Sequence, residues 1–227
     1  MELEKQSFRV VTSKAEANSF HHRIGGFYDR MTGWVEAPLR KQGLNLLGTR
    51  AGERVLEIGL GSGHSILARV KVVEEDGKIY GVDISEDMIE IAKSKLEHEK
   101  LFKEGDLLSI DAITLPYPTG MMDAIFINFT LELFDTLEIS KFLAECYRVL
   151  RPGGRVVVLG LSGQVYKALS LRLYEWAHRR FLKKIDYRPV FIPQMLREAG
   201  FNIERVEPRK RGTIPAEIIL ARRGASR

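Results

Sequence analysis

Short apolar runs of strand type alternate along this chain with segments whose apolar residues recur at helical spacing. The strand-type runs lie at 55–58, 78–84, 123–128, 155–161, 201–206 and 216–221. One helical stripe consists of Ile139, Phe142, Leu143, Cys146 and Leu150. With 227 residues, 44% of them hydrophobic, the chain can hold one sizeable core, and the pattern predicts a single α/β domain. The last two strands have no helix between them, so we expect them to form an antiparallel pair.

Three glycines at alternate positions end the first strand-type run. Gly59, Gly61 and Gly63 follow residues 55–58, and a helical pattern starts directly after them. A strand, a glycine turn and a helix bring the backbone close to a ligand and point amide N–H groups at it. The partial positive charge of the helix N-terminus suits a phosphate or a carboxylate. The stretch therefore predicts a site for a nucleotide-like ligand.

The spacing of the glycines indicates which ligand binds. A nicotinamide oxidoreductase would carry G-x-G-x-x-G, but His64 stands where the third glycine of that pattern belongs. Glu57 lies two positions before Gly59, and the pattern E-x-G-x-G-x-G resembles motif I of the class I S-adenosylmethionine (SAM) methyltransferases. The resemblance implies a Rossmann-like fold: a seven-stranded, mostly parallel sheet with an antiparallel last strand and helices on both faces. It also implies SAM as cofactor, with Glu57 and the glycine loop near its amino acid group.

A second acidic residue ends the next strand. Asp83 lies 20 positions after Gly63, which is the reach of one helix and a return strand. We therefore expect Asp83 to face the glycine loop and to accept hydrogen bonds from the ribose hydroxyls of the cofactor. Ser85 is expected to cap the following helix, whose predicted buried stripe is Met88, Ile91, Ala92 and Leu96. We also expect Ile84 and Met88 to contact the cofactor.

Two later segments complete the predicted cofactor site. A third strand is expected near 101–103, and the resemblance then implies that Asp106 lies near the adenine amino group and Leu107 against its ring. The apolar run at 123–128 ends in a polar break formed by Asn128, Phe129 and Thr130. In the class I methyltransferases the backbone at this place passes beside the methionine part of SAM and the methyl acceptor.

Parts of the chain resemble the UbiE/COQ5-like methyltransferases, which methylate quinone rings. Tyr28 and its neighbours look like their entry segment, and residues 148–162 look like their second signature, including Leu-Arg-Pro-Gly-Gly. The pattern departs at Gly160, where those enzymes carry glutamate, and at Glu132-Leu133, where they carry an Arg-Asn pair. The resemblance implies that residues 1–50 form an N-terminal helical cap with Tyr28 on the cofactor, and that 51–227 form the SAM-binding domain.

The net charge of +5 is concentrated in one segment of the chain. Residues 165–188 carry seven basic and two acidic residues, and the rest of the chain is neutral. We expect a basic helical insertion at about 164–188 over the acceptor site. Residues 166–188 could contact anionic lipid headgroups at a membrane, or they could form a solvated basic face.

Cysteine usage and hydropathy restrict the setting. The single cysteine, Cys146, excludes an internal disulfide and a multi-cysteine metal site, so no metal is expected. Neither a signal-peptide stretch nor an apolar run of about 18 residues occurs. These features favour a cytoplasmic protein, with peripheral contact at the inner membrane face as a further option.

Methyl transfer from a sulfonium is an in-line displacement in which the protein binds, orients and excludes water. The catalytic residue is unknown from sequence, and the candidates for a general base are His178, Tyr174, His21 and His22. A small or lipophilic acceptor is expected, with a demethylmenaquinone-like quinone preferred. The alternatives are a phosphatidylethanolamine-type headgroup amine and a SAM-binding module without catalysis.

Nucleic acid is the least favoured acceptor. The Asn-Pro-Pro-Tyr type motif of adenine methylation would fall at 128–131, where the chain reads Asn-Phe-Thr-Leu. The sequence leaves the oligomeric state open.

Overall fold

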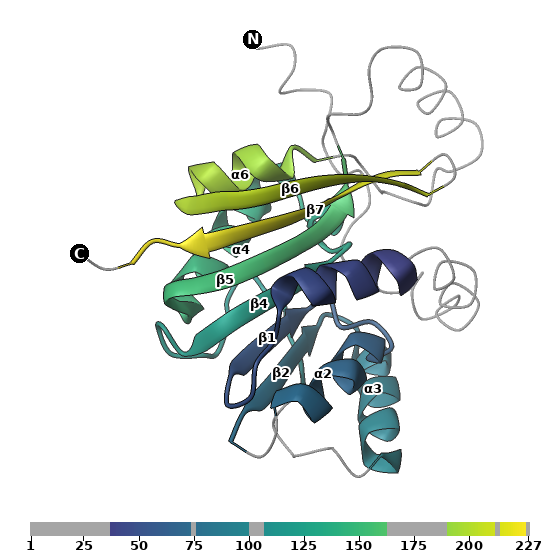
Figure 1. Cartoon of the computed structure of the whole chain (residues 1–227). Helices are drawn as coiled ribbons and strands as arrows, with labels where there is room; N and C mark the ends of the chain where they lie inside the picture. Colours follow the sequence, from purple (N-terminus) through teal and green to yellow (C-terminus); the bar gives the residue numbers. More distant parts are fainter. Residues whose placement is uncertain (1–36, 74–75, 100–106, 163–189, 212–213, 226–227) are drawn as a thin grey trace.

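The computed structural model describes residues 37–73, 76–99, 107–162, 190–211 and 214–225. Within these residues seven strands form one sheet in the order β3-β2-β1-β4-β5-β7-β6 (Figure 1). The strands are β1 (Arg54–Ile58), β2 (Lys78–Asp83), β3 (Leu107–Ser109), β4 (Met122–Asn128), β5 (Leu150–Leu161), β6 (Phe201–Arg211) and β7 (Ile214–Arg223). The helices are α2 (His64–Val73), α3 (Glu86–His98), the 3-10 helix η1 (Leu131–Leu133), α4 (Thr136–Val149), α6 (Ile192–Glu198) and a helix over 37–47.

The pairing of the strands confirms the predicted sheet. β3, β2, β1, β4 and β5 pair in parallel, whereas β7 runs antiparallel to both β5 and β6. β7 inserts between β5 and β6, so the two late strands do form the antiparallel pair expected from their short connection. The architecture is therefore the α/β, mostly parallel arrangement of the Rossmann-like class I methyltransferases.

Helices cover both faces of the sheet, as predicted. Side chains of each strand alternate between two apolar clusters, because successive residues of a strand point to opposite faces. The helix at 37–47, α2 and α3 contribute to one cluster, and α4 and α6 contribute to the other (Figure 1). Cys146 of α4 is fully buried in the second cluster, which confirms that it is a core residue.

Two details of the expected secondary structure differ from the structure. The third strand pairs with β2 at 107–109 instead of near 101–103, and the predicted stretch lies outside the described residues. In α3 the buried residues are Ile89, Ala92 and Leu96, so the assignment of Met88 and Ile91 to the buried stripe was wrong, and Met88 is only half-buried. Ile91 is 38% exposed, because the stripe facing the sheet passes through Ile89.

The parallel strands bring the predicted cofactor residues to one edge of the sheet. β1, β2 and β4 end at Ile58, Asp83 and Asn128, and in an open α/β sheet ligands bind outside these carboxyl ends. Residues 37–47, part of the predicted N-terminal cap, pack through Leu39, Leu44 and Leu47 on one face of the sheet. The rest of that cap lies outside the described residues, and the division at residue 50 stays a prediction.

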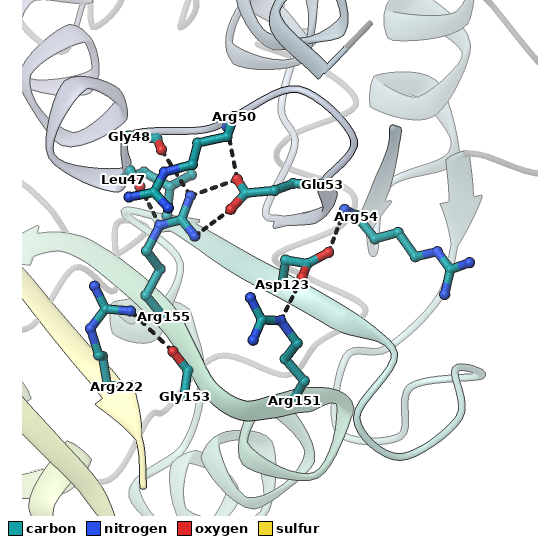
Figure 2. A network of polar contacts seen from close by, with 10 residues as sticks. All are labelled: Leu47, Gly48, Arg50, Glu53, Arg54, Asp123, Arg151, Gly153, Arg155 and Arg222. Atoms are coloured by element: carbon teal, nitrogen blue, oxygen red, sulfur yellow. Dashed lines mark hydrogen bonds and ion pairs between the residues drawn. The ribbon is translucent and has the colours of Figure 1, made fainter. Parts of the chain in front are cut away.

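A buried ion pair joins three segments at the opposite edge of the sheet (Figure 2). Arg155 of β5 donates to both carboxylate oxygens of Glu53, at 2.8 and 2.7 Å. It also donates to the carbonyl oxygens of Leu47 and Gly48, at the end of the helix over 37–47. The side chains of Arg155 and Glu53 are only 9% and 11% exposed. This clamp therefore ties the helix at 37–47 and the segment before β1 to the centre of the sheet.

The clamp also keeps Glu53 ionised. Burial raises the pKa of Glu53, but hydrogen bonds from the Arg155 guanidinium and from the Arg50 N–H outweigh burial and lower the pKa below its usual value. A charged carboxylate that is buried destabilises the folded state unless a cation stays paired with it.

We predict that Arg155→Ala lowers the free energy of unfolding by about 3–5 kcal/mol, because Glu53 would remain buried without its cation. Arg205 is the matched control, since its side chain is 60% exposed in its pair with Glu207. Arg205→Ala should cost less than about 1 kcal/mol. Denaturant unfolding of both variants measures the difference, and equal losses would contradict the structural role of the clamp.

Candidate functional site

The three loop glycines have different surroundings. Gly59, Gly61 and Gly63 all have positive φ angles, of 74°, 50° and 77°, which side chains disfavour. A Cβ on Gly59 would lie 1.9 Å from Thr130 Oγ1, and one on Gly63 would lie 2.8 Å from the Cβ of Ala92. A Cβ on Gly61 would meet no atom of the described residues within 4 Å. Two glycines therefore permit close packing, whereas Gly61 borders open space where a ligand can approach the backbone.

Asp83 holds this loop to the tip of β2. Its Oδ2 accepts a hydrogen bond from the Gly61 N–H at 2.9 Å, and its Oδ1 accepts one from the Ser85 N–H at 2.9 Å. One carboxylate thus fixes both the glycine loop and the residues that begin the next helix. The spacing in the sequence anticipated this position beside the glycine loop, and the ribose contact itself stays a prediction.

The residues after Asp83 lie at the same carboxyl-terminal edge of the sheet as the glycine loop. Ser85 occupies the N-cap position of α3, but its hydroxyl makes no capping hydrogen bond, so the expected side-chain cap is absent. Ile84 is 43% exposed, and Met88 is half-buried. Leu107 is buried at the start of β3, where it pairs with Gly81 of β2.

Glu57 is a buried carboxyl group in the middle of the sheet. Burial raises its pKa to about 8, although a hydrogen bond from Ser65 and the charges of Arg40 and Arg69 act in the opposite direction. Its Oε1 is buried and has no hydrogen-bond partner among the described residues. A buried acceptor in this state calls for a donor. A cationic N–H group, such as the ammonium of SAM, meets that requirement, so the residues present fit the cofactor.

The end of β4 combines an unusual backbone with tight packing. Phe129 has φ 48°, in the left-handed region that residues with side chains rarely adopt, and its N–H donates to the Leu159 carbonyl at 2.7 Å. The Thr130 hydroxyl lies 2.9 Å from the Asn128 carbonyl oxygen and 3.2 Å from that of Ile58. Asn128 Oδ1 is buried without a hydrogen-bond partner in the described part of the chain. Strained backbone of this kind is concentrated at functional sites.

Several candidate residues cannot be placed. Tyr28, Asp106, His21, His22, Tyr174 and His178 lie outside the described residues, as does the basic segment at 164–188. Their proposed roles stay predictions.

The sequence analysis missed a feature that links its two departures from the quinone methyltransferase pattern. Glu132 of η1 is fully buried, and its Oε1 accepts a hydrogen bond from the Leu161 N–H at 2.5 Å. A Cβ on Gly160 would lie 2.5 Å from that same oxygen. The missing side chain at Gly160 therefore makes room for Glu132. Both departures were visible in the sequence, but only the fold shows that they meet.

Comparisons with known proteins agree with this geometry. Residues 55–154 match the family described as Methyltransferase domain. The chain is 32% identical over 170 residues to the Ubiquinone/menaquinone biosynthesis C-methyltransferase UbiE of Marinomonas sp. (strain MWYL1). That alignment covers 70% of this chain and 67% of the relative, and several other UbiE proteins are covered over 61–64% of their length.

Solved structures share the fold. A SAM-dependent methyltransferase from Aquifex aeolicus has a TM-score of 0.59 at 23% identity, over 80% of this chain and 88% of that chain. The [4+2]-cyclase SpnF has a TM-score of 0.71 at 18% identity, over 97% of this chain and all of SpnF. The cyclase shows that this fold alone does not determine the reaction. The sequence relatives and the E-x-G-x-G-x-G loop decide the family: the chain belongs to the class I SAM-dependent methyltransferases, is UbiE-like, and uses SAM as its cofactor.

Proposed function

We propose that this enzyme transfers the methyl group of SAM to a ring carbon of a lipophilic quinol of the demethylmenaquinol type. The open approach to Gly61, on a loop held by Asp83, carries the cofactor half of the proposal. The acceptor half is supported by the similarity to a protein named for ubiquinone and menaquinone biosynthesis. Bound SAM supplies the electrophilic methyl group, and the chain binds, orients and excludes water.

The individual roles at the cofactor follow from position and charge. Asp83 would accept hydrogen bonds from the ribose hydroxyls, and Glu57 would pair with the ammonium group through its unsatisfied Oε1. The backbone of Gly59, Gly61 and Gly63 would approach the amino acid part, and that of 128–130 would pass beside the methionine and the acceptor. Ile84, Met88, Leu107, Asp106 and Tyr28 complete the proposed contacts.

The phospholipid alternative has weaker support. It depended on the basic segment at 166–188, which lies outside the described residues, whereas the similar proteins are named for quinone methylation. Contact of that segment with an anionic membrane surface would bring a cytoplasmic enzyme to a membrane-borne quinol. No helix in the described part of the chain is long and apolar enough to cross a membrane.

The proposed activity is tested with methyl-labelled SAM and two acceptors, reduced demethylmenaquinone and phosphatidylethanolamine, each in vesicles. We expect label on a ring carbon of the quinol, identified by mass spectrometry, and none on the amine lipid. Labelling of the lipid alone would establish the alternative. SAM binding with no transfer to either acceptor would contradict quinol methylation.

Two glycine variants test the cofactor loop. Gly61→Ala should abolish SAM binding while lowering stability by only about 1–2 kcal/mol, since the new methyl group enters open space at a strained φ. Gly59→Ala should lower stability more, because its Cβ would overlap the hydroxyl of Thr130. Calorimetric titration with SAM and thermal unfolding measure both effects. Unchanged SAM affinity in Gly61→Ala would contradict the assigned site.

Glu57→Gln tests the buried carboxyl group. Because folding raises the pKa of Glu57 from 4.5 to about 8, the folded state binds a proton more tightly than the unfolded state. Wild-type stability relative to Glu57→Gln should therefore fall as the pH rises from 4.5 through 8, in the absence of SAM. At pH 9, where the wild-type carboxyl group is ionised, the variant should bind SAM roughly tenfold or more weakly, having lost a charged partner. Unfolding at pH 5, 7 and 9 gives the first result, and a pH-independent difference would contradict it.

A further inference from the structure

Two buried glutamates border Gly160, on the face of the sheet covered by α4 and α6. Glu217 of β7 pairs directly with Gly160 of β5 in the antiparallel register. Directly paired residues point to the same face, with Cβ positions about 4.5–5.5 Å apart. Glu132 Oε1 lies 2.5 Å from the Cβ position of Gly160. Glu132 and Glu217 therefore both border Gly160, although they belong to two different elements.

Glu217 is the member of this pair with unused hydrogen-bonding capacity. Glu217 is only 2% exposed, and its Oε2 accepts a hydrogen bond from the Ser162 hydroxyl at 3.3 Å. Its Oε1 is buried and has no hydrogen-bond partner among the described residues. Burial raises the pKa of Glu217 to about 7 despite the bond from Ser162. A buried acceptor of this kind is costly unless a bound molecule supplies a donor.

The pair adjoins the proposed cofactor site. Glu132 lies two residues after Thr130, and the Thr130 hydroxyl lies against Gly59 of the glycine loop. In the sheet, β4 lies between β1, which carries the glycine loop, and β5, which carries Gly160. In the proposed cofactor site the backbone of 128–130 passes beside the methionine part of SAM, so Glu132 would lie near the methyl group that is transferred.

Apolar side chains accompany the two carboxyl groups. Ile192 of α6 lies beside Gly160, since its Cδ1 is 2.6 Å from the glycine's Cβ position. The neighbours of Glu132 and Ile192 in the chain, Leu133 and Phe191, are 42% and 52% exposed. An apolar molecule with a polar hydrogen donor matches this combination, as is usual for a small-molecule site.

We propose that Glu217 and Glu132 bind a ring hydroxyl of the methyl acceptor, that Glu217 Oε1 accepts its proton, and that Ile192 packs against the ring. This inference rests on the proposed function and assigns the acceptor subsite within it. Gly160 contributes by leaving the space that the Glu132 carboxylate occupies.

The chemistry balances without a further reactant. The hydroxyl proton moves to Glu217 Oε1, and the electron pair of the broken O–H bond stays on the ring oxygen and enriches the ring carbon. That carbon forms a bond to the methyl group as the methyl–sulfur bond breaks and its electron pair remains on sulfur. The ring carbon then loses its own proton to solvent, and the oxygen recovers a proton from Glu217.

The test compares Glu217→Gln with wild-type enzyme and with Glu207→Gln, a control on β6 whose carboxylate pairs with Arg205 and Arg209. Glu217→Gln should keep the SAM affinity and should not unfold earlier, because a buried amide carries no charge to desolvate. Its kcat on the quinol should fall by about 100-fold or more, the usual effect of losing a general base. Glu207→Gln should retain the wild-type rate.

A binding experiment separates this inference from the proposed function. Enzyme saturated with S-adenosylhomocysteine is titrated with a naphthohydroquinone and with its dimethyl ether, which has the same ring but no hydroxyl donor. Wild type should bind the hydroquinone more tightly by tenfold or more, and Glu217→Gln and Glu132→Gln should lose this preference. A wild type that binds both probes equally, or a Glu217→Gln variant that keeps the preference, would overturn the inference even if quinol methylation is observed. A wild type that discriminates between the probes but methylates no quinol would overturn the proposed function alone.

Discussion

The hydrogen bond from the Gly61 N–H to the Asp83 carboxylate is the contact around which the cofactor edge is organised. It joins a loop after β1 to the tip of β2, two segments that local preferences alone would leave independent. The same carboxylate accepts the Ser85 N–H, so one side chain sets the start of α3 as well as the path of the glycine loop. On the other side of the loop, contact between Gly59 and Thr130 connects it to β4. These contacts connect the ends of three neighbouring strands, β1, β2 and β4.

The sequence predicted the features that depend on short-range patterns. The glycine loop, the acid at the tip of β2 and the parallel order of elements follow from local spacing, and the structure contains all of them. Ile91 was assigned to the wrong face of α3 because the apolar residues of this helix are not confined to one stripe. The start of β3 was misplaced because three residues give too weak a periodic signal.

The acceptor side could not be predicted in the same way. Glu217 and Gly160 are opposed only because β7 inserts next to β5 in one particular register, and a shift of one residue would turn Glu217 to the other face. Glu132 arrives from a third element, after β4. A glycine and a glutamate in separate segments carry no mark of this proximity, so their relation exists only in three dimensions. The combination has a physical reason, because a side chain at Gly160 would overlap the carboxylate of Glu132.

The Arg155 clamp has a consequence for how such enzymes can change over time. It lies at the edge of the sheet opposite to the cofactor loops and ties the helix at 37–47 and the approach to β1 to β5 (Figure 2). Because this anchorage does not involve Gly160 or Glu132, changes at those two positions need not loosen the framework. One framework could therefore carry different side chains at these positions and, on the proposed acceptor site, receive different methyl acceptors.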